Sequence, residues 1–334
     1  MTRPLIFLFP GQSSRDPEML DRLEAVHSGV GKRARARIEA RCPPDAPWPA
    51  IGGLNPPAGA IASLNASNLQ VQLSVTAANL AYLELADAHG LVAQASAGMS
   101  LGEYSHLVHI GAIEAEACLD LIAARGMAYD RGPRGMMVAV QPVELAALEA
   151  LTAQVQRSLG GGSELVAVSN VNSPSQCVIA GQTEAVDALS SLVEQELAAI
   201  PKVIEERIPM HCDRFLPVAE VLRPILQAAP WRPPARDYWP NVLGEKRVEP
   251  RRETLVELLV AHVHRRVEWS RTIDGLLAEH PGAILVEVGP RRNLAAVLGR
   301  RWHPETHCYS LDLMDKAGPE SFRARAQEIL DAAK

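Results

Sequence analysis

Apolar residues along the chain follow two spacings, one typical of buried strands and one typical of helices. Leu5–Phe9 is a continuous apolar run ended by Pro-Gly, which predicts a strand buried on both faces. Further strands are predicted at 91–97, 283–288 and 308–311. Helical spacing predicts helices at 69–89, 101–110, 114–129, 215–228, 255–263, 269–278 and 320–333. This alternation favours an α/β protein with a mostly parallel sheet covered on both faces.

Between residues 134 and 208 the predicted strands and helices follow one another at shorter intervals, which predicts a separate small unit. Strands are predicted at 136–140, 165–168, 176–180 and 203–208, and helices at 143–159 and 183–199. The order β-α-β-β-α-β is that of a ferredoxin-like subdomain. We therefore expect a large subdomain of residues 1–133 and 209–334, into which the small subdomain 134–208 is inserted as a wall over a cleft. The stretch 42–68, rich in Pro, Gly, Ala and Asn, predicts a loop.

Composition and charge narrow the protein class only slightly. The chain has 334 residues, 47% hydrophobic and 22% charged, with a net charge of −6, so no basic field favours nucleic acid or membrane surfaces. No apolar run approaches the roughly 18 residues of a membrane span. The five cysteines are scattered without a Cys-x-x-Cys pair, which indicates reduced thiols in a cytoplasmic protein. We expect a monomer without a metal site.

The stretch Gly98-Met99-Ser100-Leu101-Gly102 carries the first candidate chemistry. It lies between a predicted strand and a predicted helix, as a nucleophile elbow does. A sharp turn lifts the Ser hydroxyl clear of the sheet, and the following helix N-terminus stabilises an oxyanion. An ordinary Gly-rich turn is the alternative for the five residues alone. The strand and helix on either side favour the nucleophile.

A Ser nucleophile needs a base, usually a His, and the chain has ten. His211 follows the last strand of the small unit, where the chain returns to the cleft, and it is the first candidate. His106 and His109 lie one helical turn apart, and we expect them to pack on the helix or its surface. His262 lies in a predicted helix without a cluster of further ligands, so a metal site there is disfavoured.

Seven blocks of the sequence resemble the malonyl-CoA:acyl-carrier-protein transacylases, which include the acyltransferase domains of polyketide synthases. The blocks are residues 9–14, 98–104, 125–126, 172–181, 211, 267–269 and 287–290. Their order and spacing match the family from about residue 4 to about residue 311. The resemblance implies an α/β-hydrolase-like large subdomain with a ferredoxin-like insert.

The resemblance also implies a two-step acyl transfer. Ser100 would attack a thioester with His211 as the base, and the backbone N–H groups of Gln12 and Leu101 would form the oxyanion hole. The backbone carbonyl of His262 would orient His211, and Asn241 matches another Asn near the site, where packing is an equal alternative. No cofactor is bound, because the acyl group arrives and leaves on the phosphopantetheine of coenzyme A or of an acyl carrier protein, the expected partner.

The acyl group is where the chain departs from the family. Arg125 matches the Arg that pairs with a malonyl carboxylate, a role suited to its planar fork. Met99 stands where the family usually has His, and Met210 where it tends to have a small or aromatic residue. Flexible apolar side chains at both positions indicate a changed pocket, although core packing is an alternative. We therefore favour a non-standard acyl group, such as an aminoacyl or peptidyl starter, transferred in polyketide-type biosynthesis.

Two other functions stay open at this point, as does the place where the carrier protein binds. Malonyl transfer is supported by Arg125. An editing acyl hydrolase is also possible, although family members of that kind usually lack this Arg. An acidic carrier could bind a basic patch on this acidic protein, and scattered solvated side chains are the alternative. The candidate contacts are Arg265, Arg266, Arg291, Arg292, Arg300 and Arg301.

Overall fold

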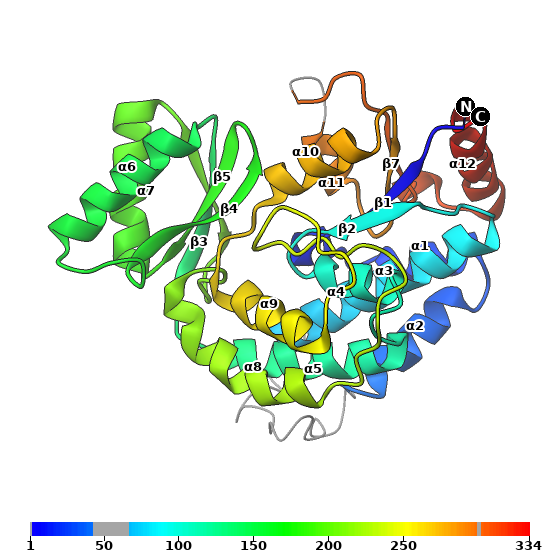
Figure 1. Ribbon diagram of the computed structural model, residues 1–334, viewed down its shortest axis with the longest axis horizontal. Coiled ribbons are helices and arrows are strands. Elements are labelled where there is room, and N and C mark those ends of the chain that lie inside the picture. Colours follow the sequence, from blue (N-terminus) through cyan, green and yellow to red (C-terminus); the bar gives the residue numbers. More distant parts are fainter. Residues whose placement is uncertain (1, 43–66, 299–301) are drawn as a thin grey trace.

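The computed structural model describes residues 2–42, 67–298 and 302–334, and it contains two sheets side by side (Figure 1). The larger sheet has the strand order β2-β1-β7-β8, and all its neighbouring strands run parallel. Its strands are β1 (Leu5–Phe9), β2 (Ala95–Gly98), β7 (Ile284–Glu287) and β8 (Cys308–Ser310). The predicted α/β class with a parallel sheet is confirmed.

Strand β1 is buried on both faces, as its unbroken apolar run predicts. Leu5, Phe7 and Phe9 belong to one core cluster, while Ile6 and Leu8 belong to another on the opposite face. Side chains alternate between the faces of a strand, so one short strand supports two layers. Because β1 is central, the turn that follows it is held firmly against the end of β2.

Helices cover both faces of the parallel sheet (Figure 1). They are α1 (Met19–Val26), α2 (Val30–Glu39), α3 (Asn68–Ala88), α4 (Gly102–His109), α5 (Ala115–Asp130), α8 (Leu216–Ala228), α9 (Arg252–His264), α10 (Trp269–Glu279), α11 (Asn293–Val297) and α12 (Pro319–Ala332). The pattern did not predict α1, α2 or α11. Helix α2 is strongly charged and buries little more than Val30, Ala34 and Ile38, a stripe too narrow to stand out.

The second sheet is antiparallel and has the strand order β4-β5-β3-β6. It contains β3 (Met136–Gln141), β4 (Val166–Ser173), β5 (Gln176–Gly181) and β6 (Ile200–Glu205), with α6 (Leu145–Ser158) and α7 (Thr183–Leu197). The predicted β-α-β-β-α-β order is confirmed, within the range 134–208 that we propose for the small subdomain. Met137, Val178 and Ala180 belong to the core of the large subdomain, so the second face of this sheet packs against it.

Three predicted elements need correction or fall outside the description. Strand β6 begins at Ile200, earlier than the predicted 203, because it pairs with β3 from Gln141 onward. Ile200 is largely exposed at this sheet edge, so the start of β6 has no buried apolar residue that would mark it in the sequence pattern. The strand before the elbow covers only Ala95–Gly98 of the predicted 91–97. The predicted loop 42–68 lies almost entirely outside the described residues.

Candidate active site

Ser100 sits at the sharp turn between β2 and α4. Its φ angle is 50°, in the left-handed region that residues other than Gly rarely adopt. A Cβ added at Gly98 would lie 2.0 Å from the backbone of Gly102, so the two flanking positions touch and must be Gly. The predicted strand, turn and helix are therefore all present, and they form a nucleophile elbow.

His211 lies against the Ser100 hydroxyl. The distance from Ser100 Oγ to His211 Nε2 is 2.8 Å, and His211 Nδ1 lies 2.7 Å from the backbone oxygen of His262. A carbonyl oxygen can only accept, so Nδ1 carries the proton and Nε2 is free to accept the proton of Ser100. Burial and the nearby charge of Arg125 lower the pKa of His211 to about 3, and at neutral pH it is a neutral base.

The backbone around the nucleophile leaves two donors free. The turn after β1 approaches the elbow so closely that a Cβ at Gly11 would lie 2.8 Å from the Met99 oxygen and 3.8 Å from the Leu101 nitrogen. Within the described residues, the N–H groups of Gln12 and Leu101 donate no hydrogen bond. Two such donors beside a Ser hydroxyl can stabilise a tetrahedral oxyanion.

Arg125 on α5 is a buried cation, only 1% exposed. Its three guanidinium nitrogens have no hydrogen-bond partner among the described residues. The guanidinium carbon lies 4.1 Å from the ring centre of Tyr129 and 5.4 Å from that of Tyr104, so aromatic faces supply part of the lost solvation. A buried charge without a hydrogen-bonded partner is costly, and a carboxylate would relieve that cost.

The two methionines that neighbour Ser100 and His211 in the sequence have different surroundings. Met99 is half-buried and packs against the core cluster that contains Ile6 and Leu8. Met210 is 5% exposed and belongs to the core of the large subdomain. Both flank the catalytic pair in sequence, and their contact with an acyl group stays a prediction.

Asn241 hydrogen-bonds directly to the elbow, which its sequence position did not indicate. Its Oδ1 accepts a hydrogen bond from the Ser100 N–H at 2.6 Å, and its Nδ2 donates to the Gly98 oxygen at 2.6 Å. Sequence reasoning missed its neighbours Glu103 and Tyr238. Glu103 accepts from the Asn241 N–H at 3.1 Å and from the Tyr238 hydroxyl. The signal available in the sequence was the acidic side chain of Glu103 in the first turn of α4, a helix that is largely buried.

Glu103 and His262 form a buried titratable pair next to the candidate catalytic residues. Burial raises the pKa of Glu103 to about 8, against the lowering effects of its hydrogen bonds from Tyr238 and Asn241 and of the Arg125 charge. Burial lowers the pKa of His262 well below its usual value. Its Nε2 lies 3.6 Å from Glu103 Oε2, and neither ring nitrogen has a hydrogen-bond partner among the described residues. The backbone carbonyl of His262 contacts His211, as the family resemblance implies.

His106 and His109 are structural and lie behind the elbow. Each forms a hydrogen bond with the Ser96 hydroxyl. Ser96 Oγ lies 2.7 Å from His106 Nδ1 and 2.8 Å from His109 Nδ1. The N–H of Trp239 donates to His106 Nε2 at 3.1 Å. Burial lowers the pKa of His106 to about 3 and that of His109 to about 4. This neutral network joins β2 and α4 to the segment that carries Asn241.

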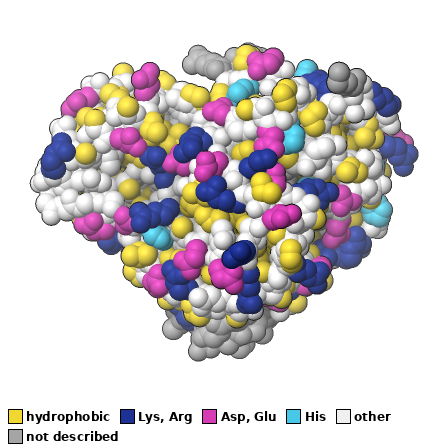
Figure 2. All heavy atoms as spheres, in the orientation of Figure 1, with side chains coloured by type: hydrophobic (Ala, Val, Ile, Leu, Met, Phe, Trp, Pro, Cys, Tyr) yellow, Lys and Arg dark blue, Asp and Glu magenta, His cyan; other side chains and the backbone are white. Residues whose placement is uncertain are grey.

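The arginines considered for carrier binding are partly neutralised. Arg266 pairs with Glu149 at 2.5 Å and Glu268 at 2.6 Å, while Arg291 pairs with Asp16 at 3.3 Å. Arg265 and Arg292 are exposed, with Arg265 3.6 Å from Asp213. Arg300 and Arg301 lie outside the described residues. Basic and acidic side chains alternate over the face in Figure 2.

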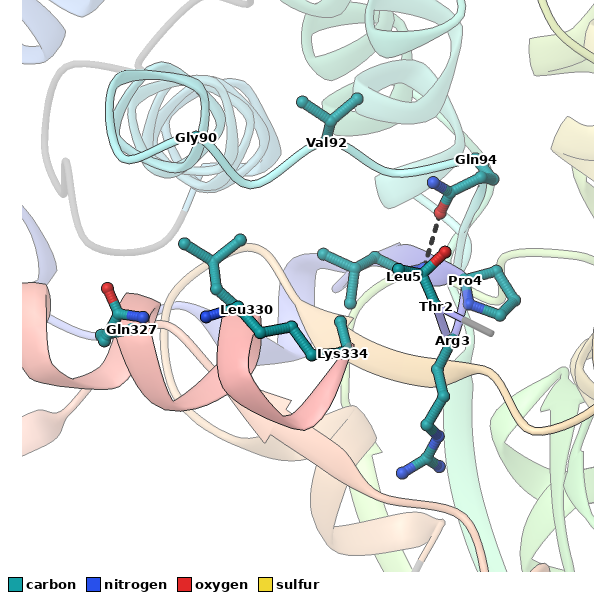
Figure 3. Close-up of a pocket in the computed structure, with 11 residues that line it drawn as sticks. Thr2, Arg3, Pro4, Leu5, Gly90, Val92, Gln94, Gln327, Leu330 and Lys334 are labelled. Atoms are coloured by element: carbon teal, nitrogen blue, oxygen red, sulfur yellow. Dashed lines mark hydrogen bonds between the residues drawn. The ribbon is translucent and has the colours of Figure 1, made fainter.

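A separate hollow lies away from this site, at the amino ends of β1 and β2 (Figure 3). It is lined by Arg3, Leu5, Val92, Gln94 and Lys334 among others. Ligands of open parallel sheets bind at the carboxyl ends of the strands, where Ser100 lies. In the described residues no group of His, Cys, Asp and Glu could hold a metal ion, and no helix is long and apolar enough to cross a membrane.

A Ser-His pair at the carboxyl end of a parallel sheet, beside two backbone donors that are free among the described residues, is suited to acyl-transfer chemistry. Comparison with known proteins gives the same class. The acyl transferase domain family matches residues 60–331, and the chain belongs to this family of acyltransferases.

Two relatives and one complex illustrate the similarity. The malonyl CoA-acyl carrier protein transacylase of Escherichia coli O157:H7 is 29% identical over 304 residues, which cover 88% of this chain and 91% of the relative. The crystal structure of FabD from Acinetobacter baumannii is 27% identical, with a TM-score of 0.82 and complete coverage of both chains. A malonyl-transacylase in complex with its type II polyketide synthase acyl carrier protein shares the fold, at 24% identity, a TM-score of 0.80 and coverage of 98% and 99%.

Proposed function

We propose that this enzyme transfers a carboxylate-bearing acyl group, of the malonyl type, from a phosphopantetheine thioester to the thiol of an acyl carrier protein. The observation that carries the choice of acyl group is Arg125. Its buried guanidinium has no hydrogen-bond partner among the described residues, while its charge lowers the pKa of His211. A carboxylate on the acyl group would form charge-assisted hydrogen bonds with the planar fork.

The first half of the reaction forms an acyl-enzyme. Ser100 Oγ attacks the thioester carbonyl while its proton passes to His211 Nε2. The N–H groups of Gln12 and Leu101 stabilise the oxyanion. When the intermediate collapses, the carbon–sulfur bond breaks and the departing thiolate takes the proton from His211. The acyl group is then linked to Ser100 as an ester, and His211 is neutral again.

The second half runs the same steps with the carrier thiol. His211 takes the thiol proton as the sulfur attacks the ester carbon, and the same N–H groups stabilise the oxyanion. Ser100 then leaves and recovers its proton from His211. The relatives named as acyl carrier protein transacylases support a carrier as the acceptor. Exposed Arg265 and Arg292, together with Arg266 and Arg291, remain our proposed contacts for it.

An aminoacyl or peptidyl group is the second candidate, because apolar Met99 and Met210 flank the catalytic residues. Arg125 weighs against a free amine on such a group. An ammonium brought into the same buried site would meet a like charge at low dielectric. A starter without a free amine would avoid this repulsion.

Intact-mass measurement of the enzyme separates the candidates. The protein is mixed with malonyl-CoA or acetyl-CoA, and the mass gained by Ser100 is followed over time. We expect rapid malonylation, little acetylation, and no adduct on the Ser100→Ala variant. Addition of a phosphopantetheinylated carrier protein should then move the malonyl group to the carrier. Acetylation as fast as malonylation would contradict the carboxylate, and free malonate released without a carrier would favour a hydrolase.

A further inference from the structure

The side chain of Asn241 bridges the two ends of the turn that carries the nucleophile. One end is the Gly98 carbonyl oxygen, which accepts from Asn241 Nδ2 at 2.6 Å. The other is the Ser100 N–H, which donates to Asn241 Oδ1 at 2.6 Å. A single amide therefore fixes the spacing between the last residue of β2 and the nucleophile.

This spacing matters because Ser100 has an unfavourable backbone conformation. A left-handed φ is unfavourable for a residue with a Cβ, and it persists only where the surroundings hold it. The same conformation directs Ser100 Oγ at His211 and leaves the next N–H, that of Leu101, beside the turn at Gly11. If the turn relaxed, the nucleophile and the oxyanion donor would move together.

Asn241 is itself held on both sides by backbone hydrogen bonds. It is fully buried, its N–H donates to Glu103 Oε2 at 3.1 Å, and its carbonyl oxygen accepts from the Glu268 N–H at 2.8 Å. Glu103 lies in the first turn of α4, directly after the elbow, and also accepts from the Tyr238 hydroxyl. The amide thus has a fixed position relative to the helix whose N-terminus supports the oxyanion.

We propose that Asn241 is a positioning residue that holds Ser100 in its reactive left-handed conformation. It acts on the rate at which Ser100 is acylated and not on the affinity for the acyl donor. The proposal rests on the proposed function only through the role of Ser100 as nucleophile.

The first test measures how fast Ser100 reacts in an Asn241→Ala variant. A fluorophosphonate, which labels activated serines whatever the acyl specificity, and malonyl-CoA are used as separate probes, with adducts followed by intact mass. We expect both rates to fall about 100-fold, as a displacement of about 1 Å does in an active site. The KM for malonyl-CoA should stay at the wild-type value.

An Asn241→Asp variant gives a signature that a packing role would not produce. A protonated Asp has the shape of Asn, with an oxygen that accepts from Ser100 and an O–H that donates to Gly98. Ionised Asp has no donor and repels an oxyanion. Burial raises the pKa of such a carboxyl. The ionisable residues around position 241 are Glu103, which accepts from its N–H, Glu268, which donates a backbone N–H to its carbonyl, and His262, which lies 3.6 Å from Glu103. The labelling rate should therefore recover as the pH falls from 7.5 to 5, where His211, with a pKa of about 3, stays neutral.

Ser96→Ala is the matched control. Ser96 lies on the same strand, two residues before Gly98, and its buried hydroxyl hydrogen-bonds to His106 and His109 but not to Ser100. This variant should lose thermal stability and keep the wild-type labelling rate. The proposal is overturned if Asn241→Ala labels at the wild-type rate, if Ser96→Ala slows as much, or if Asn241→Asp shows no recovery at low pH.

The outcomes also separate this proposal from the proposed function. A wild-type enzyme that reacts with the fluorophosphonate but not with malonyl-CoA would refute the carboxylate-bearing substrate and leave the role of Asn241 testable by labelling. A wild-type Ser100 that reacts with neither probe would overturn both.

Discussion

Burial changes how several side chains of this enzyme ionise or pair. It lowers the pKa of His211 to about 3 and raises that of Glu103 to about 8, and Arg125 is buried without a hydrogen-bonded partner among the described residues. Perturbed groups of this kind gather at functional sites. We therefore expect substitutions at the site to change the free energy of unfolding and the rate of acylation in opposite directions.

Replacing Arg125 with Met should raise stability and lower activity together. The substitution removes a buried charge that lacks a hydrogen-bonded partner while keeping most of the apolar volume, so the free energy of unfolding should rise by about 1–3 kcal/mol. Malonylation of Ser100 should fall about 100-fold, the worth of a charge-assisted hydrogen bond of about 1.5–3 kcal/mol. Urea unfolding and intact-mass kinetics measure the two effects. Arg125→Lys keeps the charge without the fork and should lie between. A destabilised Met variant would contradict the unpaired charge.

The low pKa of His211 predicts an acylation rate that is flat over the acidic range. A His with an ordinary pKa of about 6.5 would be half protonated at pH 6.5, and the protonated half could not act as a base. With a pKa of about 3, His211 keeps its free Nε2 throughout, so the initial rate of Ser100 malonylation should not decline between pH 7 and pH 5. Stopped reactions analysed by mass at half-unit steps measure this. A limb with its midpoint near pH 6.5 would show that the base is more solvated than the structure indicates.

At the scale of elements, the turn after β1 and the first turn of α4 are in backbone contact. A Cβ at Gly102 would lie 2.0 Å from the Phe9 oxygen, and one at Gly98 would lie 2.0 Å from Gly102 itself. The two Gly of the motif are therefore packing residues, which bring the helix N-terminus against the central strand. The same close approach would put a Cβ added at Gly11 within 3.8 Å of the Leu101 nitrogen.

Gly102→Ala should consequently unfold or strongly destabilise the protein. The clash is with backbone atoms, which cannot rotate away, and a loss of about 4 kcal/mol or more in the free energy of unfolding is expected. Gly111→Ala is the matched control at the other end of α4. Its φ of 79° carries a strain of about 1–2 kcal/mol, but a Cβ there meets nothing within 4 Å. Chemical unfolding compares the two, and equal losses would contradict the contact.

The sequence predicted the strands and most helices because their apolar spacing is strong. It predicted Ser100 through the Gly-x-Ser-x-Gly turn, His211 through its position after the small subdomain, and Arg125 through a block that resembles a known family. It did not predict the short or charged helices, where few residues face the core. It also did not reveal what Asn241 bonds to, because Asn241 and Glu103 are 138 positions apart and only the fold brings them together. The burial of Arg125 agrees with its helix, which is buried on nearly every side, but the sequence does not show that the guanidinium lacks a hydrogen-bond partner among the described residues.

Over the whole molecule, buried histidines and buried carboxyls have opposite effects on stability. Folding lowers the pKa of five described histidines, so the unfolded chain binds more protons below about pH 6.5 and stability falls as the pH falls. They are His106, His109, His211, His262 and His264. Folding raises the pKa of Glu103 to about 8 and that of Glu287 to about 7. Their contribution is complete below about pH 4.5 and is lost as the pH rises through those values.

The five histidines outweigh the two carboxyls in the acidic range, and the carboxyls dominate above neutrality. The free energy of unfolding should therefore pass through a maximum between about pH 6 and pH 7. Urea unfolding from pH 5 to pH 8.5 measures this curve. A Glu287→Gln variant cannot ionise, so it should steepen the acidic side between about pH 4.5 and pH 7, where Glu287 titrates, and leave the alkaline side above about pH 7.5 unchanged. Stability that rises steadily up to pH 8.5 in the wild-type protein would show that Glu103 and Glu287 are ionised in the folded state.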